Sequence, residues 1–473
     1  MASDLTVIVL AAGGGTRMRS KTAKVLHEIG GRSMVGHVLA AVQALEPGRV
    51  VAVIGHQRDQ VGPHILSLMP DVILAVQEDQ QGTGDAVRIA VEAAGTTSGT
   101  VLVAAGDTPL LRGESLRDFA LEHEAAQCAV SVLSGVVDDP FGYGRIVRND
   151  EGDVEAIIEE NDATADQRSI HEISSGILAF DAEFLTEALP KLDNDNAKGE
   201  YYLTDTVGLA RDAGLTVGAF PIDDWMQTEG ANDRVQLANL GRELNRRIVE
   251  QWMRDGVTVM DPDTTWIEAG VSLAPDVILL PNTQLLGATV VGEDAVIGPD
   301  TSLKDCEIGA GARVVRAHGE LAVVGNGANV GPYAYLRPGT ELAGGGKIGT
   351  FVETKNAHIG AGAKVPHLSY VGDADIGEGT NIGAGTIFAN YDGVDKHHTT
   401  VGKGAKTGAN NTFVAPVTIG DGAMTGGGTV VRRDVPPGHL AVSGGPQRNL
   451  DRRAPRDQES TSMGDAGPDE GES

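Results

Sequence analysis

A six-residue repeat of aliphatic side chains runs through the second half of this 473-residue chain and restricts its fold more than any other feature. Many of the repeated residues are followed by glycine, as in "IGPD", "IGAG", "IGEG" and "IGDG". A period of six fits neither an α-helix nor a simple alternating strand, and it is typical of a parallel β-helix in which each hexad forms one flat side of a coil. The inward-facing positions are predicted to be Leu279, Leu285, Val291, Ile297, Val330, Leu336, Leu342, Ile348, Ile359, Val365, Val371, Ile376, Ile382, Val401, Thr407, Phe413, Ile419, Thr425 and Val431.

Two segments interrupt the period. They are "KDCEIGAGARVVRAHGEL", residues 304–321, and "NYDGVDKHHTT", residues 390–400. Both are predicted to be loops that leave the coil. Because loops on a rigid scaffold commonly carry binding groups, these two segments are candidates for substrate contacts.

The N-terminal part of the chain follows a different pattern. Short aliphatic runs such as "LTVIVLAA", "RVVAVIG" and "TVLVAAGD" alternate with longer amphipathic stretches, which predicts βαβ units around a mostly parallel sheet. The first run leads into the glycine-rich "LAAGGGTRM", residues 10–18, and such a loop presents backbone N–H groups to phosphate oxygens. The third glycine of a dinucleotide fingerprint and the Gly-Lys-Ser/Thr of a P-loop are both absent. The sequence therefore predicts a phosphate site of another kind, with Arg17 as its fixed positive charge.

Residues 232–256 carry apolar side chains at helical spacing, Glu243 and Arg247 as an i,i+4 pair, and Gly256 as a stop signal. This pattern predicts a helix that connects the two halves. Residues 452–473 are polar, end in acidic residues and have little to bury, so they are expected to be disordered and without chemistry of their own.

Composition limits the partners. A formal net charge of −29 argues against nucleic acid and anionic membranes, since both require basic surfaces. There is no apolar stretch of membrane-spanning length and no secretory signal, so a cytoplasmic protein without stable membrane insertion is expected. Cys128 and Cys306 are far apart in the sequence and form no metal or redox motif, which is consistent with a reducing compartment.

Several motifs, taken in order, resemble one family over nearly the whole chain. "LAAGGGTRM", "KVLHEIGG", "QGTGDA", "GDTPL" and "GYGRI" resemble the sugar-1-phosphate nucleotidyltransferases. Together with a hexad domain that contains "LRPG", "HLSYVGDADIG", "NIGAGT" and "NYDG", they resemble the bifunctional bacterial N-acetylglucosamine-1-phosphate uridyltransferase/glucosamine-1-phosphate acetyltransferases. The resemblance implies a Rossmann-like α/β nucleotidyltransferase domain over residues 1–231, a linker helix over 232–256, a left-handed parallel β-helix over 257–451 and an acidic tail over 452–473.

The resemblance also implies the reactions. Acetyl-CoA would acetylate glucosamine-1-phosphate, and UTP would then react with N-acetylglucosamine-1-phosphate to give UDP-N-acetylglucosamine and pyrophosphate, feeding the synthesis of peptidoglycan and other cell-envelope polysaccharides. The resemblance further implies a homotrimer with threefold symmetry, which the sequence itself does not show. The main alternative is a single-activity nucleotidyltransferase with a structural β-helix. Two others are a non-catalytic sugar-nucleotide sensor and a β-helix metalloenzyme, for which His318, His358, His367, His397 and His398 are available as ligands without a clear three-histidine spacing.

Uridylyl transfer requires charge neutralisation and alignment rather than a protein base, because the second pKa of the sugar phosphate is about 6. By resemblance, Arg17 and Lys24 hold the triphosphate, while Asp107, which ends "VLVAAGD", and Asn232 bind Mg²⁺. Asn232 also opens the connecting helix, where an asparagine is a common N-cap, so its part in the metal site stays open. The other implied nucleotide and sugar contacts are Leu10, Ala11, Ala12, Gly13, Gly14, Gly15, Gln77, Gly82, Thr83, Gly144, Glu159 and Ser174. Ser174 stands where the family usually has asparagine, and its hydroxyl has fewer donors than an amide.

Acetyl transfer requires a base, since the ammonium form of the sugar amine is not a nucleophile. By resemblance His367 in "PHLSYVGD" is this base, and Asp373 is near enough in sequence to orient its ring. Arg337 and Lys355 would hold the sugar phosphate. The resemblance further implies sugar contacts from Tyr370, Asn381, Asn390 and Tyr391, and acetyl-CoA contacts from Ala384, Ala409 and Gly427. Ala409 stands where the family often has serine, so backbone N–H groups would have to stabilise the oxyanion there.

Overall fold

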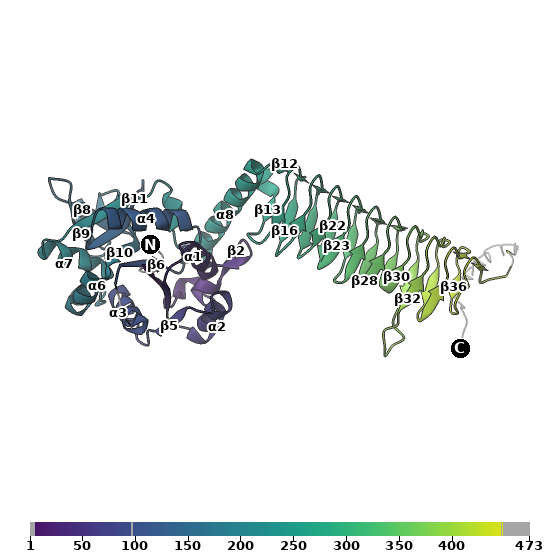
Figure 1. Cartoon of the computed structure of the whole chain (residues 1–473), viewed down its shortest axis with the longest axis horizontal. Coiled ribbons are helices and arrows are strands. Elements are labelled where there is room, and N and C mark those ends of the chain that lie inside the picture. The colour runs from purple at the N-terminus through teal and green to yellow at the C-terminus, as the bar shows by residue number, and fades with distance from the viewer. Residues whose placement is uncertain (1–4, 96–97, 446, 448–473) are drawn as a thin grey trace, which may run out of the picture.

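The computed structural model describes residues 5–95, 98–445 and 447, so the predicted tail at 452–473 lies outside the described residues. The chain forms an α/β part, a long helix and a rod of stacked β-coils (Figure 1). The helix, α8 (Arg234–Arg254), joins the other two parts. Its N-cap is Asp233, whose carboxylate accepts from the backbone N–H groups of Val235 and Gln236.

A nine-stranded sheet forms the centre of the α/β part, with the main order β11-β7-β10-β6-β1-β4-β5. All neighbouring pairs along this order are parallel except those of β10, which runs antiparallel to β6 and β7. The mostly parallel sheet predicted from the alternating runs is confirmed. The strands are β1 (Leu5–Ala11), β4 (Arg49–Ile54), β5 (Ile73–Val76), β6 (Thr100–Ala105), β7 (Val130–Val136), β8 (Gly144–Arg148), β9 (Val154–Ile158), β10 (Glu172–Asp181) and β11 (Val217–Pro221), with a separate pair β2 (Glu28–Ile29) and β3 (Arg32–Ser33).

Helices cover both faces of this sheet, because successive residues of each strand point to opposite sides. Val7 and Val9 of β1 pack in a core with the first group of helices, whereas Ile8 between them packs in a core with the second. The first group is α1 (Met34–Gln43), α2 (Arg58–Leu68) and α4 (Gly113–Ala125), and the second is α3 (Thr83–Ala94), α6 (Ala182–Ala188) and α7 (Thr206–Asp212); α5 (Ala165–Arg168) is short.

The C-terminal part is a left-handed parallel β-helix. Every inward position predicted from the hexad repeat is buried, so that prediction is confirmed. One flat side consists of β12 (Thr258–Val259), β15 (Ile278–Leu279), β18 (Val296–Ile297), β21 (Arg313–Val314), β24 (Asn329–Val330), β27 (Lys347–Thr350) and β29 (Lys364–His367), with β35 (Met424–Thr425) and β37 (Leu440–Ala441) as a separate pair. The other sides consist of β13 (Trp266–Ile267), β14 (Ser272–Leu273), β16 (Thr283–Leu286), β17 (Val290–Val291), β19 (Thr301–Lys304), β20 (Glu307–Ile308), β22 (Ala317–Glu320), β23 (Ala322–Val324), β25 (Ala334–Leu336), β26 (Thr340–Leu342), β28 (Glu353–Ile359), β30 (Tyr370–Ile376), β31 (Ile387–Ala389), β32 (Thr399–Val401), β33 (Thr412–Val414), β34 (Val417–Ile419) and β36 (Val430–Val431).

The prediction of a loop at residues 304–321 is wrong. Strands β20, β21 and β22 keep this segment in the coil, and Ile308 and Val314 are buried in its core. The period breaks because the coil is shorter here. Leu285 pairs with Leu303 and Leu303 pairs with Gly319, so the second of these turns contains fewer residues than the first.

The prediction of a loop at residues 390–400 is confirmed. Ala357 pairs with Ala374, and Ala374 in turn pairs with Thr399, so the chain takes a longer path in the second of these turns. The additional residues form the loop that projects from the rod beside β32 (Figure 1).

Candidate active sites

The glycine-rich loop follows β1 at the carboxyl edge of the parallel strands, where open α/β sheets bind ligands. Gly15 has φ +55°, and a Cβ added there would lie 2.5 Å from the Cβ of Lys24, so a side chain at this position would collide with Lys24. Gly13 has open space beside it, and Gly14 approaches only the side chains of Gln80 and His56. Leu10, Ala11 and Ala12 lead into this loop, which therefore leaves its surface accessible to a phosphate chain.

Lys24, Asp107 and Asn232 meet at this edge. The Lys24 ammonium forms an ion pair with Asp107 Oδ2, and Lys24 Nζ donates to Asn232 Oδ1 at 2.9 Å. The helix is capped by Asp233, so the Asn232 side chain is not the N-cap, and its amide oxygen accepts from Lys24 instead. A carboxylate and an amide oxygen are donors that suit Mg²⁺, which ordinarily completes its shell with water and substrate phosphates.

The Arg17 guanidinium is exposed on a short 3₁₀ turn, η1 (Thr16–Met18). It forms no ion pair with another residue that the structure describes. On a chain with a net charge of −29, a cation of this kind beside a glycine-rich loop is available to an anionic ligand.

The predicted base-reading segment precedes α3. The buried Gln77 side chain donates from Nε2 to Gly82 O at 3.1 Å and to Asp85 Oδ2 at 2.8 Å, which fixes the orientation of its amide. Gly82 has φ +109°, and a Cβ there would lie 2.5 Å from the backbone oxygen of Tyr201. Thr83 starts α3, and its hydroxyl accepts from Leu203 N at 3.1 Å. This network presents the Gln77 amide oxygen in a fixed position, as reading a base edge would require.

A pocket of about 200 Å³ brings together the predicted sugar contacts. Glu159 accepts from the Thr204 hydroxyl at 3.2 Å, and burial raises the pKa of the Glu159 carboxyl. The Ser174 hydroxyl accepts from Gly176 N at 3.2 Å, so it serves the local turn of β10. The lining residues are Leu10, Thr83, Gly142, Tyr143, Gly144, Glu159, Ser174, Ser175, Gly176, Leu178, Leu203 and Thr204. Thr204 was not identified from the sequence, and it carries no signal there except its place after "YYL".

In the β-helix, one group of predicted residues gathers around the ends of β25, β28 and β30. Arg337 Nη1 pairs with Glu353 Oε1 at 2.8 Å. Asn390 Nδ2 donates to Asp373 Oδ2 at 2.5 Å and lies 3.5 Å from the Tyr370 hydroxyl. Tyr391 is exposed in the projecting loop, and its hydroxyl donates to Gly393 O at 2.7 Å.

The same loop brings Lys396 to Lys355. The pKa of the Lys396 ammonium is lowered, first by its contact with Lys355 and then by the like charge of that residue. Sequence analysis missed Lys396, and the available signal was its position shortly after Asn390 in the same motif. Two neighbouring ammonium groups suit a phosphate dianion, which would relieve their mutual repulsion.

A second group lies at another corner of the coils. His367 ends β29, and its carbonyl accepts from Gly385 N at 3.2 Å. Asn410 N donates to Ala384 O at 2.7 Å, and Gly428 N donates to Ala409 O at 2.8 Å. The corner segments that contain His367, Ala384, Ala409 and Gly427 therefore stack on successive coils. Asn381 belongs to the flat side that leads into this corner, where it pairs with Lys364 and Lys406.

Asp373 does not orient the His367 ring. Its two carboxylate oxygens accept from Asn356 Nδ2 at 2.8 Å and from Asn390 Nδ2. The physical reason is that β29 and β30 lie on different flat sides, with a turn at Leu368 and Ser369 between them. The expectation of that contact is wrong.

The histidines of the β-helix do not converge. His358 and His398 both contact Asp375, at 2.8 and 2.9 Å, while His397 contacts Asp392 and His318 packs on Tyr335. Among the described residues, no group of three or more His, Cys, Asp or Glu is arranged to hold a metal ion.

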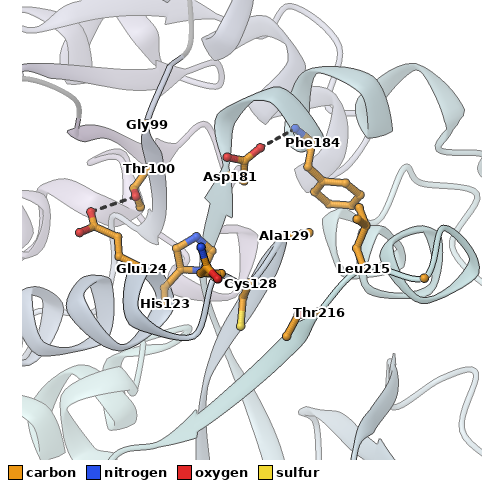
Figure 2. A pocket seen from close by; sticks show the side chains of 12 residues that line it. Gly99, Thr100, His123, Glu124, Cys128, Ala129, Asp181, Phe184, Leu215 and Thr216 are labelled. Atoms are coloured by element: carbon orange, nitrogen blue, oxygen red, sulfur yellow. Dashed lines mark hydrogen bonds between the residues drawn. The ribbon is translucent and has the colours of Figure 1, made fainter.

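A larger cavity, of about 720 Å³, is lined by residues at the amino ends of β6, β7 and β11 (Figure 2). This is the edge of the sheet opposite the glycine-rich loop, which follows the carboxyl end of β1. None of the predicted site residues lines it. The buried His123 contacts Ser131 Oγ through Nδ1 at 2.8 Å, and Thr100 donates to Glu124 at 3.1 Å. Burial lowers the pKa of His123 to about 4, although Asp181 and the backbone of Phe180 act in the opposite direction.

Comparison with known proteins places the whole chain in one family. A family model described as the MobA-like NTP transferase domain matches residues 7–170. Bifunctional proteins GlmU from Pseudarthrobacter chlorophenolicus, Rhodococcus jostii and Corynebacterium glutamicum are 56%, 54% and 52% identical to this chain over 452, 474 and 456 residues. These alignments cover 95%, 98% and 95% of this chain and 92%, 95% and 94% of the relatives.

The chain belongs to the GlmU family of bifunctional proteins. The expected activities, acetyltransferase and uridyltransferase, are confirmed, and the single-activity alternative is not favoured. The expected fold, a nucleotidyltransferase domain followed by a left-handed β-helix, is confirmed as well. Among the described residues, no helix is both long enough and apolar enough to span a bilayer.

Proposed function

We propose that the N-terminal site joins UTP to N-acetylglucosamine-1-phosphate around one Mg²⁺ held by Asp107 and Asn232. The observation that carries this proposal is the convergence of both side chains on Lys24, which supplies two hard oxygen donors next to a fixed cation. When bound, Mg²⁺ would neutralise charge on the triphosphate and align it with the attacking phosphate.

The reaction forms a bond from a sugar-phosphate oxygen to the α-phosphorus of UTP and breaks the bond from that phosphorus to the pyrophosphate oxygen. The attacking oxygen is already ionised near neutral pH, so no residue has to remove a proton. Lys24 and Arg17 offset the charge that develops on the leaving pyrophosphate, and Gly13, Gly14 and Gly15 donate backbone N–H groups. Gln77 pairs with the uracil edge, while Gly82 and Thr83 allow the ring to approach.

The sugar occupies the pocket that Gly144, Glu159 and Ser174 line. Glu159 accepts from a sugar hydroxyl, and Thr204 orients the carboxylate. Because the Ser174 hydroxyl already accepts from Gly176 N, it retains one O–H donor for the sugar.

In the β-helix, Arg337, Lys355 and Lys396 bind the phosphate of glucosamine-1-phosphate, with Tyr370, Asn381, Asn390 and Tyr391 around the sugar. His367 removes a proton from the amine as its nitrogen attacks the thioester carbon of acetyl-CoA. The amide bond forms, and the carbon–sulfur bond breaks to release the thiol. Acetyl-CoA extends along the corner of Ala384, Ala409 and Gly427, where backbone N–H groups stabilise the oxyanion.

We further infer a homotrimer in which neighbouring chains complete each acetyl-transfer site. The phosphate-binding group and the His367 corner lie on different flat sides of one chain, and no hydrogen bond or ion pair between described residues joins them. A threefold assembly brings the first group of one chain to the second group of the next. Given these substrates we also propose a cytoplasmic protein with functional divisions at 1–231, 232–256 and 257–451.

One experiment tests both activities. The purified protein is incubated with glucosamine-1-phosphate, acetyl-CoA, UTP and Mg²⁺, and the products are identified by mass spectrometry. UDP-N-acetylglucosamine is expected. If N-acetylglucosamine-1-phosphate accumulates instead, the assignment of the N-terminal site is wrong, and if the amine is not consumed, the assignment of His367 is wrong.

A further inference from the structure

Arg145 of β8 is the largest of the completely buried side chains, with 1% of its surface exposed. A buried guanidinium is costly unless ion pairs and hydrogen bonds compensate for its lost hydration. In the motif "GYGRI" this residue has no predicted role of its own. The ion pair and hydrogen bonds of its guanidinium indicate its role.

Glu160 is the ion-pair partner. Arg145 Nη2 lies 2.7 Å from Glu160 Oε2, and the same carboxylate oxygen accepts from Gly142 N at 3.2 Å. Arg145 Nη1 donates to the backbone oxygen of Tyr143, and Nη2 lies 3.4 Å from the backbone oxygen of Arg168. Burial acts to raise the pKa of Glu160, but the hydrogen bonds from Arg145 and Gly142, together with the positive charges of Arg145 and Arg168, hold the carboxyl pKa below its usual range.

These contacts connect two walls of the 200 Å³ pocket. Gly142, Tyr143 and Gly144 form one wall, and Glu159, the chain neighbour of Glu160, forms part of another. Arg145 and Glu160 do not line the pocket themselves. They lie behind it and connect the backbone of residues 142–144 to the end of β9, next to Glu159.

We propose that Arg145 is a positioning residue that fixes the sugar-phosphate pocket through its ion pair with Glu160. This inference rests on the proposed function of that pocket. The planar fork of arginine reaches the carboxylate and the Tyr143 carbonyl at the same time, whereas a lysine ammonium is a single point charge. Without the guanidinium, residues 142–144 and the Glu159–Glu160 segment lose the contacts that hold them in a fixed relative position.

A matched ion pair serves as control. Arg148, three residues along the same strand, makes a bidentate pair with Glu172 through Nε and Nη2 at 2.8 and 2.7 Å. Neither Arg148 nor Glu172 lines the pocket. Arg148→Lys and Glu172→Gln therefore make the same chemical changes at an ion pair between β8 and β10, outside the walls that Gly142–Gly144 and Glu159 form.

The test measures KM for N-acetylglucosamine-1-phosphate and KM for UTP in Arg145→Lys, Glu160→Gln and the two controls. We expect the sugar-phosphate KM to rise by roughly 10- to 100-fold in both Arg145→Lys and Glu160→Gln, with the UTP KM changed less than about 2-fold. Both controls should keep the wild-type KM values. Acetyl transfer by the β-helix part, measured in the same samples, reports whether each variant is assembled.

The outcomes separate the claims. If the wild type makes no UDP-N-acetylglucosamine, the proposed function fails and this inference fails with it. If the wild type is active but Arg145→Lys and Glu160→Gln behave like the controls, or raise both KM values equally, only the positioning role is wrong. If Arg145→Lys does not fold, the milder Glu160→Gln decides, because it retains an acceptor for Gly142 N.

Discussion

Lys24 Nζ lies 2.9 Å from the Oδ1 atom of Asn232, although 208 residues separate them in the sequence. The same ammonium group pairs with Asp107. The fold therefore joins the short 3₁₀ turn η2 (Lys24–Leu26), the end of β6 and the start of α8 at one point. Variants of these residues therefore test the proposed uridylyl-transfer site.

Replacing Asp107 should disable one activity only. Asp107→Asn keeps the shape of the side chain but removes the negative charge proposed to hold Mg²⁺, so uridylyl transfer should fall by roughly 10²- to 10³-fold. Acetyl transfer takes place in the β-helix and should not change. Pyrophosphate release and thiol release, measured on the same preparation, check both statements. Equal loss of the two activities would contradict the assignment.

Asn232→Ala should impair Mg²⁺ binding at the same site to a smaller extent. Because the amide oxygen is a neutral ligand, its loss should weaken Mg²⁺ binding less than the loss of Asp107 does. The Mg²⁺ concentration that gives half-maximal uridylyl transfer should rise by about 10-fold, and saturating Mg²⁺ should restore most of the rate. A variant with an unchanged Mg²⁺ requirement would remove Asn232 from the metal site.

His367→Ala should lower acetyl transfer by roughly 10²- to 10⁴-fold, since general base catalysis contributes about that much. Uridylyl transfer from added N-acetylglucosamine-1-phosphate should be retained. His358→Ala is the matched control, because His358 is also exposed on the β-helix but contacts Asp375 and Glu341 instead. If both variants acetylate at the wild-type rate, His367 is not the base.

The two departures from the family pattern predict modest effects. The Ser174 hydroxyl accepts from Gly176 N, so Ser174→Asn exchanges this local bond for an amide that reaches further into the pocket. We expect the KM for N-acetylglucosamine-1-phosphate to fall by about 2- to 10-fold, in line with one additional hydrogen bond. Ala409→Ser should change acetyl transfer less, because the backbone N–H groups at that corner do not depend on the side chain. Steady-state kinetics of each half reaction measure both effects.

The sequence predicted the fold well wherever one physical period governed it. The hexads required inward aliphatic residues, and those positions are buried. The period did not show how the coil accommodates a shorter turn at 304–321, because pairing of Leu303 with Gly319 depends on the neighbouring coils rather than on local spacing.

The site was less predictable, because its contacts join distant segments. Motif matching named Lys24, Asp107 and Asn232 separately, but only the folded chain brings Lys24 between the other two. Nearness in the sequence allowed Asp373 to orient the His367 ring, but the turn between β29 and β30 sends Asp373 to Asn390 instead. Lys396 was missed because the projecting loop, whose path no repeat specifies, carries it to Lys355.

The buried His123, beside the cavity at the amino edge of the sheet, should make the stability of the N-terminal part sensitive to acid. Burial lowers the pKa of His123 to about 4 in the folded chain, compared with 6.5 for an unperturbed histidine. Between these values the unfolded chain binds more protons at His123 than the folded chain does. The contribution of neutral His123 to the free energy of unfolding is therefore complete above pH 6.5 and is lost as the pH falls towards 4. This lowering of the pKa corresponds to about 3 kcal/mol of stability. Urea unfolding followed by the fluorescence of Trp225, with Trp252 and Trp266 replaced by Phe, measures this loss.

His123→Gln should reduce the slope of stability against pH across that window, whatever constant change it makes to stability at pH 7. Glutamine can bond to Ser131 Oγ but carries no titrating proton. His171, which is exposed in the same part and contacts Val137 O through Nδ1 at 2.7 Å, is the control, and His171→Gln should keep the wild-type slope. A His123→Gln variant with the wild-type slope would show that other groups cause the acid sensitivity, because His123 would then bind the same number of protons in both states.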